Sequence, residues 1–94
     1  MKVIWSQNAE ITFDAIVNYI EVKFGVLSAK KFIIKVDAVI SSISIQPHIY
    51  KSTSFNNKVR KAAINKQCSM FYEINNETIR LSYFWDNRQE PLFF

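Results

Sequence analysis

The sequence predicts an α+β domain with the element order β-α-α-β-β-β, in which a helical hairpin packs on one face of a mostly antiparallel sheet. Three observations support this fold class. The first half of the chain contains two apolar stripes at helical spacing, and the second half contains segments with the period of a β-strand. Only a few residues separate the two stripes, so the helices form an antiparallel pair whose apolar faces both need the sheet.

The first elements are a strand at residues 2–5 and a helix that Ser6 can cap, with Glu10 in its first turn. Gly25, the only glycine, is placed to end this helix in a left-handed conformation. The apolar stripe of the helix consists of Ala9, Phe13, Ile16, Val17, Ile20 and Phe24.

Ser28 can cap a second helix, which Pro47 ends, because the residue before a proline disfavours the α region. The lysines outside its stripe are expected to face water. The stripe consists of Ala29, Phe32, Ile33, Val36, Ile40 and Ile43.

Three strands are predicted at residues 58–64, 68–74 and 77–85. Asn75-Asn76 suits the tight turn between the last two, since asparagine tolerates positive φ. Alternation in the last strand places Tyr83 and Trp85 in the core and Phe84 on the opposite face. There Phe84 either contacts a binding partner or packs under the loop at residues 48–57.

A chain of 94 residues is expected to form one domain, and no repeat, linker or low-complexity segment divides residues 1–94. Its single cysteine, Cys68, cannot form an internal disulfide and is expected to be a small buried hydrophobe. We find neither a signal peptide nor an apolar run long enough to span a membrane. We therefore expect a cytoplasmic protein.

The net charge is +4, and basic residues gather between Lys51 and Lys66 with no acidic residue among them. Such a stretch attracts polyanions or an acidic protein partner. A solvated strand edge, whose lysines oppose aggregation, is the alternative. One cysteine and one histidine cannot form a zinc site, and one glycine cannot form a glycine-rich phosphate loop, so we expect no metal and no cofactor.

Two segments, "WSQNAEITFDAIVNYIEVKFG" and "SAKKFIIKVDAVISSISIQP", carry the strand and the two helices. Two others, "KVRKAAI" and "SMFYEINNETIRLSYFWDNRQEP", carry the sheet, with a strand arginine, a tyrosine before the hairpin, and a closing arginine-glutamine near a proline. In this order the four segments resemble the RelE/ParE superfamily of bacterial type II toxins over almost the whole chain.

The resemblance implies a toxin that inhibits growth and is neutralised by a cognate antitoxin, as in plasmid stabilisation. ParE-like members of the superfamily are thought to act on DNA gyrase. RelE-like members cleave messenger RNA on the ribosome without a metal, with lysines and arginines on the sheet and a tyrosine near the C-terminus.

The residues that RelE-like cleavage would use are only partly present. Arg60 and Arg88 match two of the cationic positions, and they are the catalytic candidates if the chain is an RNase. A second lysine is replaced by Ala62, an arginine by Ser69, and the C-terminal tyrosine falls at or near Phe94. Since the acid and base of such a reaction are missing, we favour a ParE-like toxin that binds its target.

Three hypotheses therefore stand together: a toxin that binds a target such as DNA gyrase, a ribosome-dependent mRNA endoribonuclease, and a degenerate member that only binds an antitoxin. Arg88 is expected beside the basic strand. The sequence names neither the target, nor the antitoxin, nor the oligomeric state. The candidates for target or antitoxin binding are Lys58, Arg60, Lys61, Arg80, Phe84, Arg88 and Gln89.

Overall fold

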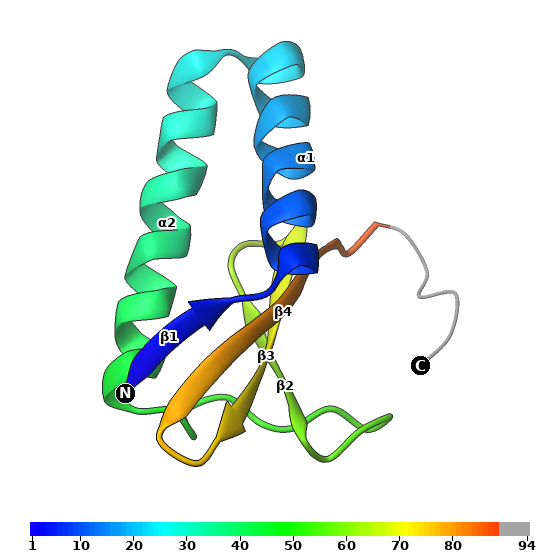
Figure 1. Cartoon of the computed structure of the whole chain (residues 1–94). Coiled ribbons are helices and arrows are strands. Elements are labelled where there is room, and N and C mark those ends of the chain that lie inside the picture. The colour runs from blue at the N-terminus through cyan, green and yellow to red at the C-terminus, as the bar shows by residue number, and fades with distance from the viewer. Residues whose placement is uncertain (89–94) are drawn as a thin grey trace.

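The structure is a computed structural model that describes residues 1–88. Figure 1 shows a helical hairpin on one face of a sheet, with the tip of the hairpin projecting beyond the sheet. The predicted element order is confirmed: β1 (Lys2–Trp5), α1 (Gln7–Phe24), α2 (Val26–Ile45), β2 (Val59–Ala63), β3 (Cys68–Asn75) and β4 (Thr78–Asp86).

The sheet has the strand order β1-β4-β3-β2. β4 is antiparallel to β3, and β3 is antiparallel to β2. β1 is parallel to β4, with Lys2 opposite Thr78 and Trp5 opposite Leu81. The sheet is therefore mixed but mostly antiparallel, as predicted, and within residues 1–88 its first strand pairs only with its last.

Ser6 joins β1, α1 and β4 at one point. Its Oγ accepts a hydrogen bond from the backbone N–H of Ala9 at 3.0 Å, which is the predicted N-cap. The same Oγ donates to the carbonyl of Ser82 at 2.9 Å, and the Ser6 backbone N–H donates to the carbonyl of Leu81 at 3.1 Å. The start of α1 is thus fixed to the middle of β4.

The second helix begins earlier than predicted. Gly25 is both the C-cap of α1 and the N-cap of α2, which starts at Val26. The prediction that Ser28 caps this helix is wrong, since its Oγ donates to the carbonyl of Phe24 at 3.3 Å inside a continuous helical hairpin. The end of α2 at Ile45, before Pro47, agrees with the prediction.

We expect Gly25→Ala to lower the free energy of unfolding by about 1–3 kcal/mol, because φ +99° and ψ +167° define a region that only glycine occupies without strain. A Cβ at this position would meet no atom within 4 Å, so the cost is backbone strain and not a clash. Urea denaturation measures the loss. Ser28→Ala is the control, and its effect should stay within about 0.5 kcal/mol because Ser28 is not a cap.

The core lies between the helices and the sheet. The apolar stripe of α2 is buried as predicted at Phe32, Val36 and Ile43, and it also includes Val39. Phe24 departs from the prediction, since 60% of it is exposed near the hairpin tip. The sheet contributes fully buried side chains from three strands: Ala62, Met70, Tyr72, Ile79, Leu81 and Phe84.

The prediction of the two faces of β4 is wrong at its C-terminal half. Phe84 is only 1% exposed and packs in the core against Trp5 and Phe13, with ring centroids 5.6 and 5.3 Å away. Tyr83 and Trp85 are half-buried instead of being in the core.

The cause is a β-bulge in β4. Leu81 pairs with Tyr72 and Tyr83 pairs with Phe71, so Ser82 is an extra residue with no partner position on β3. The extra residue shifts the alternation by one, so Phe84 falls on the same face as Leu81.

The turn between β3 and β4 consists of residues 76 and 77, one residue later than predicted. Asn76 has φ +52°, the left-handed conformation expected of an asparagine in a tight hairpin.

Candidate functional site

Arg60, on the basic strand β2, binds the backbone of the segment that precedes this strand in the chain. Arg60 is half-buried on the same face as Ala62, and its Nη1 donates to the carbonyl of Tyr50 at 2.7 Å. The backbone N–H of Lys61 donates to the carbonyl of Lys51 at 3.3 Å, which fixes the same segment. Lys58 and Lys61 are exposed. Among Lys58, Arg60 and Lys61, the two lysines are therefore the cations most accessible to a binding partner.

Arg88 makes a different set of contacts at the end of β4. Its Nε lies 3.0 Å from Oδ1 of Asp86, and its Nη2 lies 2.6 Å from Oδ2. The guanidinium carbon is 5.6 Å from the centre of the Tyr19 ring on α1. The Arg88 hydrogen bond lowers the pKa of Asp86, and hydrogen bonds from Arg88 and Lys23 lower the pKa of Tyr19.

The structure does not bring Arg60 and Arg88 together. Arg60 pairs with Tyr72, whereas Asp86 pairs with Cys68, four positions earlier on β3. At about 3.3 Å per residue this places the two ends roughly 13 Å apart along the strand. The prediction that Arg88 lies beside the basic strand is therefore wrong, because Arg88 follows the opposite end of the sheet.

The other candidates are dispersed. Arg80 is exposed and pairs in register with Glu73, while Phe84 is in the core and cannot reach a partner from there. The positions where RelE-like residues were expected, Ala62 and Ser69, are both fully buried, and Ser69 Oγ donates to Oδ1 of Asn87 at 3.0 Å. Gln89 and Phe94 lie outside the described residues.

A groove that the sequence did not predict lies between the helical hairpin and the edge of the sheet where β3 begins and β4 ends. Its volume is about 1020 Å³. Ile16 and Ile20 of α1 and Phe32 of α2 form its apolar floor, and Lys31, Lys35 and Arg88 line it with positive charge. The helical spacing of Ile16, Ile20 and Phe32 in the sequence could indicate the apolar floor. The position of this floor beside the start of β3 and the end of β4 is known only from the tertiary structure.

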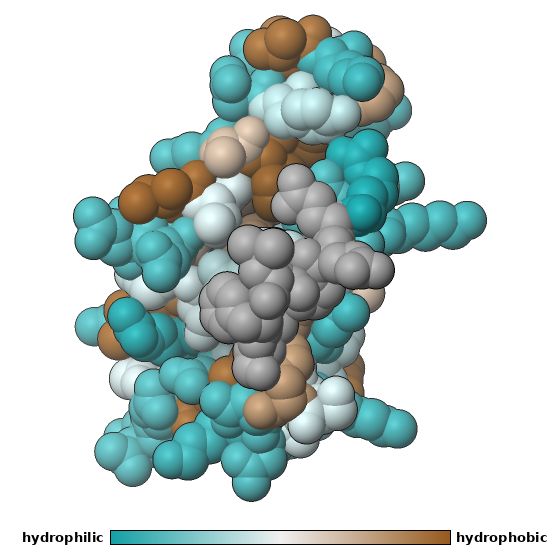
Figure 2. Space-filling view, turned by 90° about the vertical axis from the view of Figure 1, so that its right-hand side faces the viewer, coloured by the Kyte–Doolittle hydropathy of each residue, from teal (hydrophilic) through white to brown (hydrophobic). Residues whose placement is uncertain are grey.

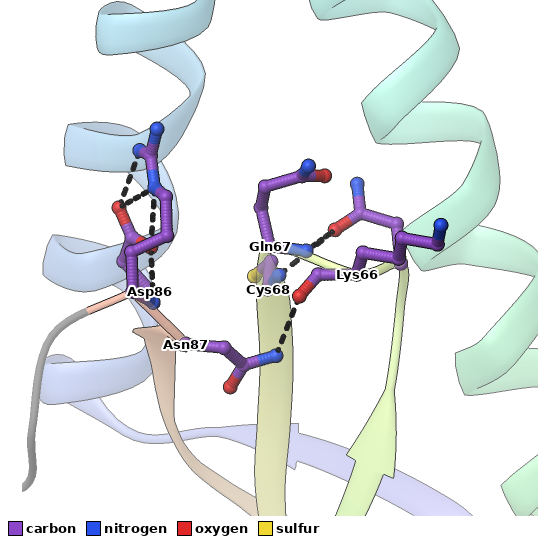
Figure 3. Close-up of polar contacts among 7 residues, drawn as sticks. Lys66, Gln67, Cys68, Asp86 and Asn87 are labelled. Atoms are coloured by element: carbon purple, nitrogen blue, oxygen red, sulfur yellow. Dashed lines mark hydrogen bonds and ion pairs between the residues drawn. The ribbon is translucent and has the colours of Figure 1, made fainter.

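Hydrogen bonds fix the wall of this groove on the sheet side. Figure 3 shows Asn87 reaching from the end of β4 to the carbonyl of Lys66, with Nδ2 at 3.3 Å. The backbone N–H of Asn87 donates to the carbonyl of Gln67 at 2.6 Å. Oδ1 of Asn65 accepts from the backbone N–H groups of Gln67 and Cys68 at 2.9 and 2.8 Å. The β2–β3 turn is thus tied to β4.

Cys68 is 3% exposed, as predicted for a small buried hydrophobe. Burial, with a smaller contribution from the Asp86 carboxylate, raises the pKa of its thiol to about 12. The folded protein therefore holds the thiol protonated at neutral pH.

We expect Cys68 to be unreactive toward a thiol-exchange reagent at pH 8 in the native protein and reactive in urea. The pKa of the thiol in the folded protein is above its value of about 8.5 in the unfolded chain. The contribution of the protonated thiol to the free energy of unfolding is therefore complete below about pH 8.5 and is lost as the pH rises toward 12. Unfolding measured at several pH values should show this fall, and the fall should be smaller in Cys68→Ala, where the raised pKa values of Tyr72 and Tyr83 still contribute. Rapid labelling of the native protein would contradict the burial.

Within residues 1–88, no group of three or more histidine, cysteine, aspartate or glutamate side chains is placed to hold a metal ion. Over the same residues, neither helix is both long and apolar enough to cross a membrane.

Comparisons with known proteins identify the family. The family model described as "ParE toxin of type II toxin-antitoxin system, parDE" matches residues 3–91. Among solved structures, the chain is similar to one in the chromosomal ParDE TA system from P. aeruginosa, with a TM-score of 0.77 and 17% identity over 92% of this chain and 95% of that chain. It is also similar to a chain of the heterotetrameric YoeB-YefM toxin-antitoxin complex from Staphylococcus aureus, with a TM-score of 0.61 and 14% identity over 90% of this chain and 94% of that chain.

A comparison with curated protein sequences found no match. At these identities the two structures establish the shared fold, and the family model establishes the relationship in sequence. Because that model covers nearly the whole chain, the protein belongs to the ParE toxin family of type II toxin–antitoxin systems, as its sequence predicted.

Proposed function

We propose that this toxin inhibits growth in the cytoplasm by binding a protein target such as DNA gyrase, that it does not cleave RNA, and that a cognate antitoxin neutralises it. The observation that carries the proposal is the separation of Arg60 from Arg88 at opposite ends of the sheet. Metal-independent RNA cleavage needs a base, an acid and a phosphate-binding cation around one scissile bond.

The environment of each arginine supports the same proposal. The Arg60 guanidinium donates to the Tyr50 carbonyl, and the Arg88 guanidinium is paired with Asp86. An arginine that is already paired is less available to a phosphate. Ser69, which stands where RelE-like members have an arginine, is fully buried and bonded to Asn87.

The antitoxin is proposed from the two structural relatives, whose titles describe a ParDE system and a YoeB-YefM toxin–antitoxin complex. In each, a toxin of this fold belongs to a pair. Exposed cations on this chain, among them Lys58, Lys61 and Arg80, suit an acidic partner.

Inducible expression tests the proposal. Expression of the chain alone is expected to arrest growth, and co-expression of the adjacent reading frame should restore it. The purified toxin should inhibit supercoiling by DNA gyrase and leave transcripts intact in a translating extract, where mapping of transcript ends detects cleavage.

Two outcomes would replace the proposal. Transcript cleavage that is lost in both Arg60→Ala and Arg88→Ala would establish the RNase alternative. Normal growth on expression alone, together with tight binding to the product of the adjacent gene, would identify a degenerate member that only binds an antitoxin.

A further inference from the structure

The helix α2 has a second apolar face, which points away from the core. Leu27 and Ile34 are each 68% exposed, and Ile45 is 79% exposed. Ile34 follows Leu27 by seven residues and Ile45 follows Ile34 by eleven, so the three side chains lie on one side of the helix. Ile34 is two residues from the buried Val36, and Ile45 is two residues from the buried Ile43, which places this side opposite the core. These three exposed residues form the outer stripe of α2.

The outer stripe does not serve the packing of the domain itself. A surface helix has polar residues on the face that meets water, whereas a helix that is apolar on both faces is buried on both. At the hairpin tip the stripe meets Val22 and Val26, which are 80% and 54% exposed. Figure 2 shows the hydrophobic surface at this tip. An exposed apolar surface of this kind marks a site of interaction.

The shape of the outer stripe suits a helix of a partner. Its large side chains stand toward its two ends, and the exposed Ala38 and Ser41 lie between the two isoleucines. Small side chains allow the axes of two packed helices to approach to about 8 Å. At a rise of about 1.5 Å per residue, the stripe extends about 27 Å from Leu27 to Ile45. A partner helix can therefore cross α2 at Ala38 and place apolar side chains on both sides of the crossing.

The charges beside the outer stripe indicate an acidic partner. Lys31 and Lys35 lie on the side toward the groove, which they line. Lys30 and Asp37 lie on the other side, and all four residues are exposed. Three positive charges and one negative charge leave a net charge of +2 beside the stripe. A surface that has carboxylates next to its apolar residues is complementary to this charge.

A second copy of the chain does not fit the outer stripe. In an antiparallel pair of α2 helices, two-fold symmetry brings Lys31 and Lys35 of both copies to the same side of the interface, which gathers four positive charges. In a parallel pair, these two lysines face Lys30 and Asp37 of the other copy, so three lysines meet one carboxylate. Like charges oppose both arrangements, and the occupant is therefore a different protein.

We infer that the outer stripe of α2 is the surface by which this toxin binds its protein target, and that the target contributes a helix with apolar residues and flanking carboxylates. The inference rests on the proposed function for the existence of a protein target, and it adds the surface that binds this target. None of Leu27, Ile34 and Ile45 lines the groove, so changes to the stripe leave the groove as it is.

The first test variant removes the apolar side chains of the stripe. Ile34→Gln with Ile45→Gln replaces both isoleucines by a polar residue of good helix propensity, so α2 should keep its stability. The matched control is Ile4→Gln with Ile49→Gln, since these isoleucines are also exposed and lie outside the hairpin.

The second test variant covers the stripe instead of removing it. Ala38→Trp places a large ring at the expected crossing point, and Ala63→Trp makes the same change at an exposed position on β2. Each variant is induced alone in growing cells, and the toxin level that halves the growth rate is measured by quantitative immunoblot. Circular dichroism verifies folding, and the affinity for the product of the adjacent reading frame is measured for every variant.

We expect both stripe variants to need at least about tenfold more toxin than wild type for the same inhibition, and both controls to stay within about twofold, because a few residues at the centre of an interface carry most of its binding energy. All four are expected to fold and to bind the product of the adjacent reading frame as wild type does.

Three results would overturn the inference and leave the proposed function in place. They are wild-type inhibition by both stripe variants, an equal loss in the controls, and loss of binding to the product of the adjacent reading frame in the stripe variants. Wild-type binding to phosphatidylglycerol vesicles that is lost in Ile34→Gln with Ile45→Gln would assign the stripe to a membrane surface instead. Normal growth on expression of the wild-type chain would refute the proposed function itself, and the inference with it.

Discussion

Phe84→Ala is expected to lower the free energy of unfolding by about 3–5 kcal/mol, the cost of removing a buried phenylalanine and leaving a cavity. Phe84 is 1% exposed, and its ring contacts Trp5 of β1 and Phe13 of α1. Phe84 therefore connects the paired strands β1 and β4 to α1. A domain of this size has a total stability of about 5–15 kcal/mol, so the loss removes a large part of it.

Chemical denaturation monitored by circular dichroism measures this effect. Phe24→Ala is the matched control, since Phe24 is 60% exposed and its removal should cost less than about 1 kcal/mol. A small effect of Phe84→Ala would mean that the ring lies on the open face of the sheet, as strict alternation along β4 predicts.

Deletion of Arg80 is expected to cost at least about 3–5 kcal/mol, although Arg80 itself is exposed. Removing one residue from a regular part of a strand forces the segment on one side of the deletion to turn over. Either Ile79 or Leu81 then leaves the core, and both are fully buried in the native protein. Thermal unfolding and one-dimensional NMR would show the loss of packing.

Deletion of Ser82 should be tolerated much better, at about 1–2 kcal/mol, because Ser82 is the extra residue of the bulge. Without it, Leu81 and Phe84 still face the helices and Tyr83 still pairs with Phe71. The cost includes the lost hydrogen bond from Ser6 Oγ to the Ser82 carbonyl. If the Ser82 deletion unfolded the protein and the Arg80 deletion did not, the bulge would have to be placed elsewhere.

The bulge in β4 separates the part of the fold that the sequence predicts from the part that it does not. Periodicity located both helices and all four strands, since burial of an apolar face determines the spacing of apolar residues along each element. The faces of β4 were predicted incorrectly after Leu81, because a bulge depends on how a strand pairs with its neighbour. No residue within β4 itself marks Ser82 as extra.

The same limit applies to the candidate site. In the sequence Arg60 and Arg88 are isolated cations, and their separation in space follows from the antiparallel register of β3 with both of its neighbours. Lys31 and Lys35 were expected only to face water. They do remain exposed, yet they also line the groove, because α2 runs beside the ends of strands that come much later in the chain.

The pairing of β1 with β4 has a consequence for synthesis of the toxin. Lys2 pairs with Thr78, and Ser6 bonds to the carbonyls of Leu81 and Ser82, so the beginning of the chain has no sheet partner until β4 has left the ribosome. Contacts between residues so distant in sequence form late in folding. Until then the apolar faces of the nascent helical hairpin lack the sheet, and the groove, which Trp85, Asp86 and Arg88 line, forms only after β4 has emerged from the ribosome.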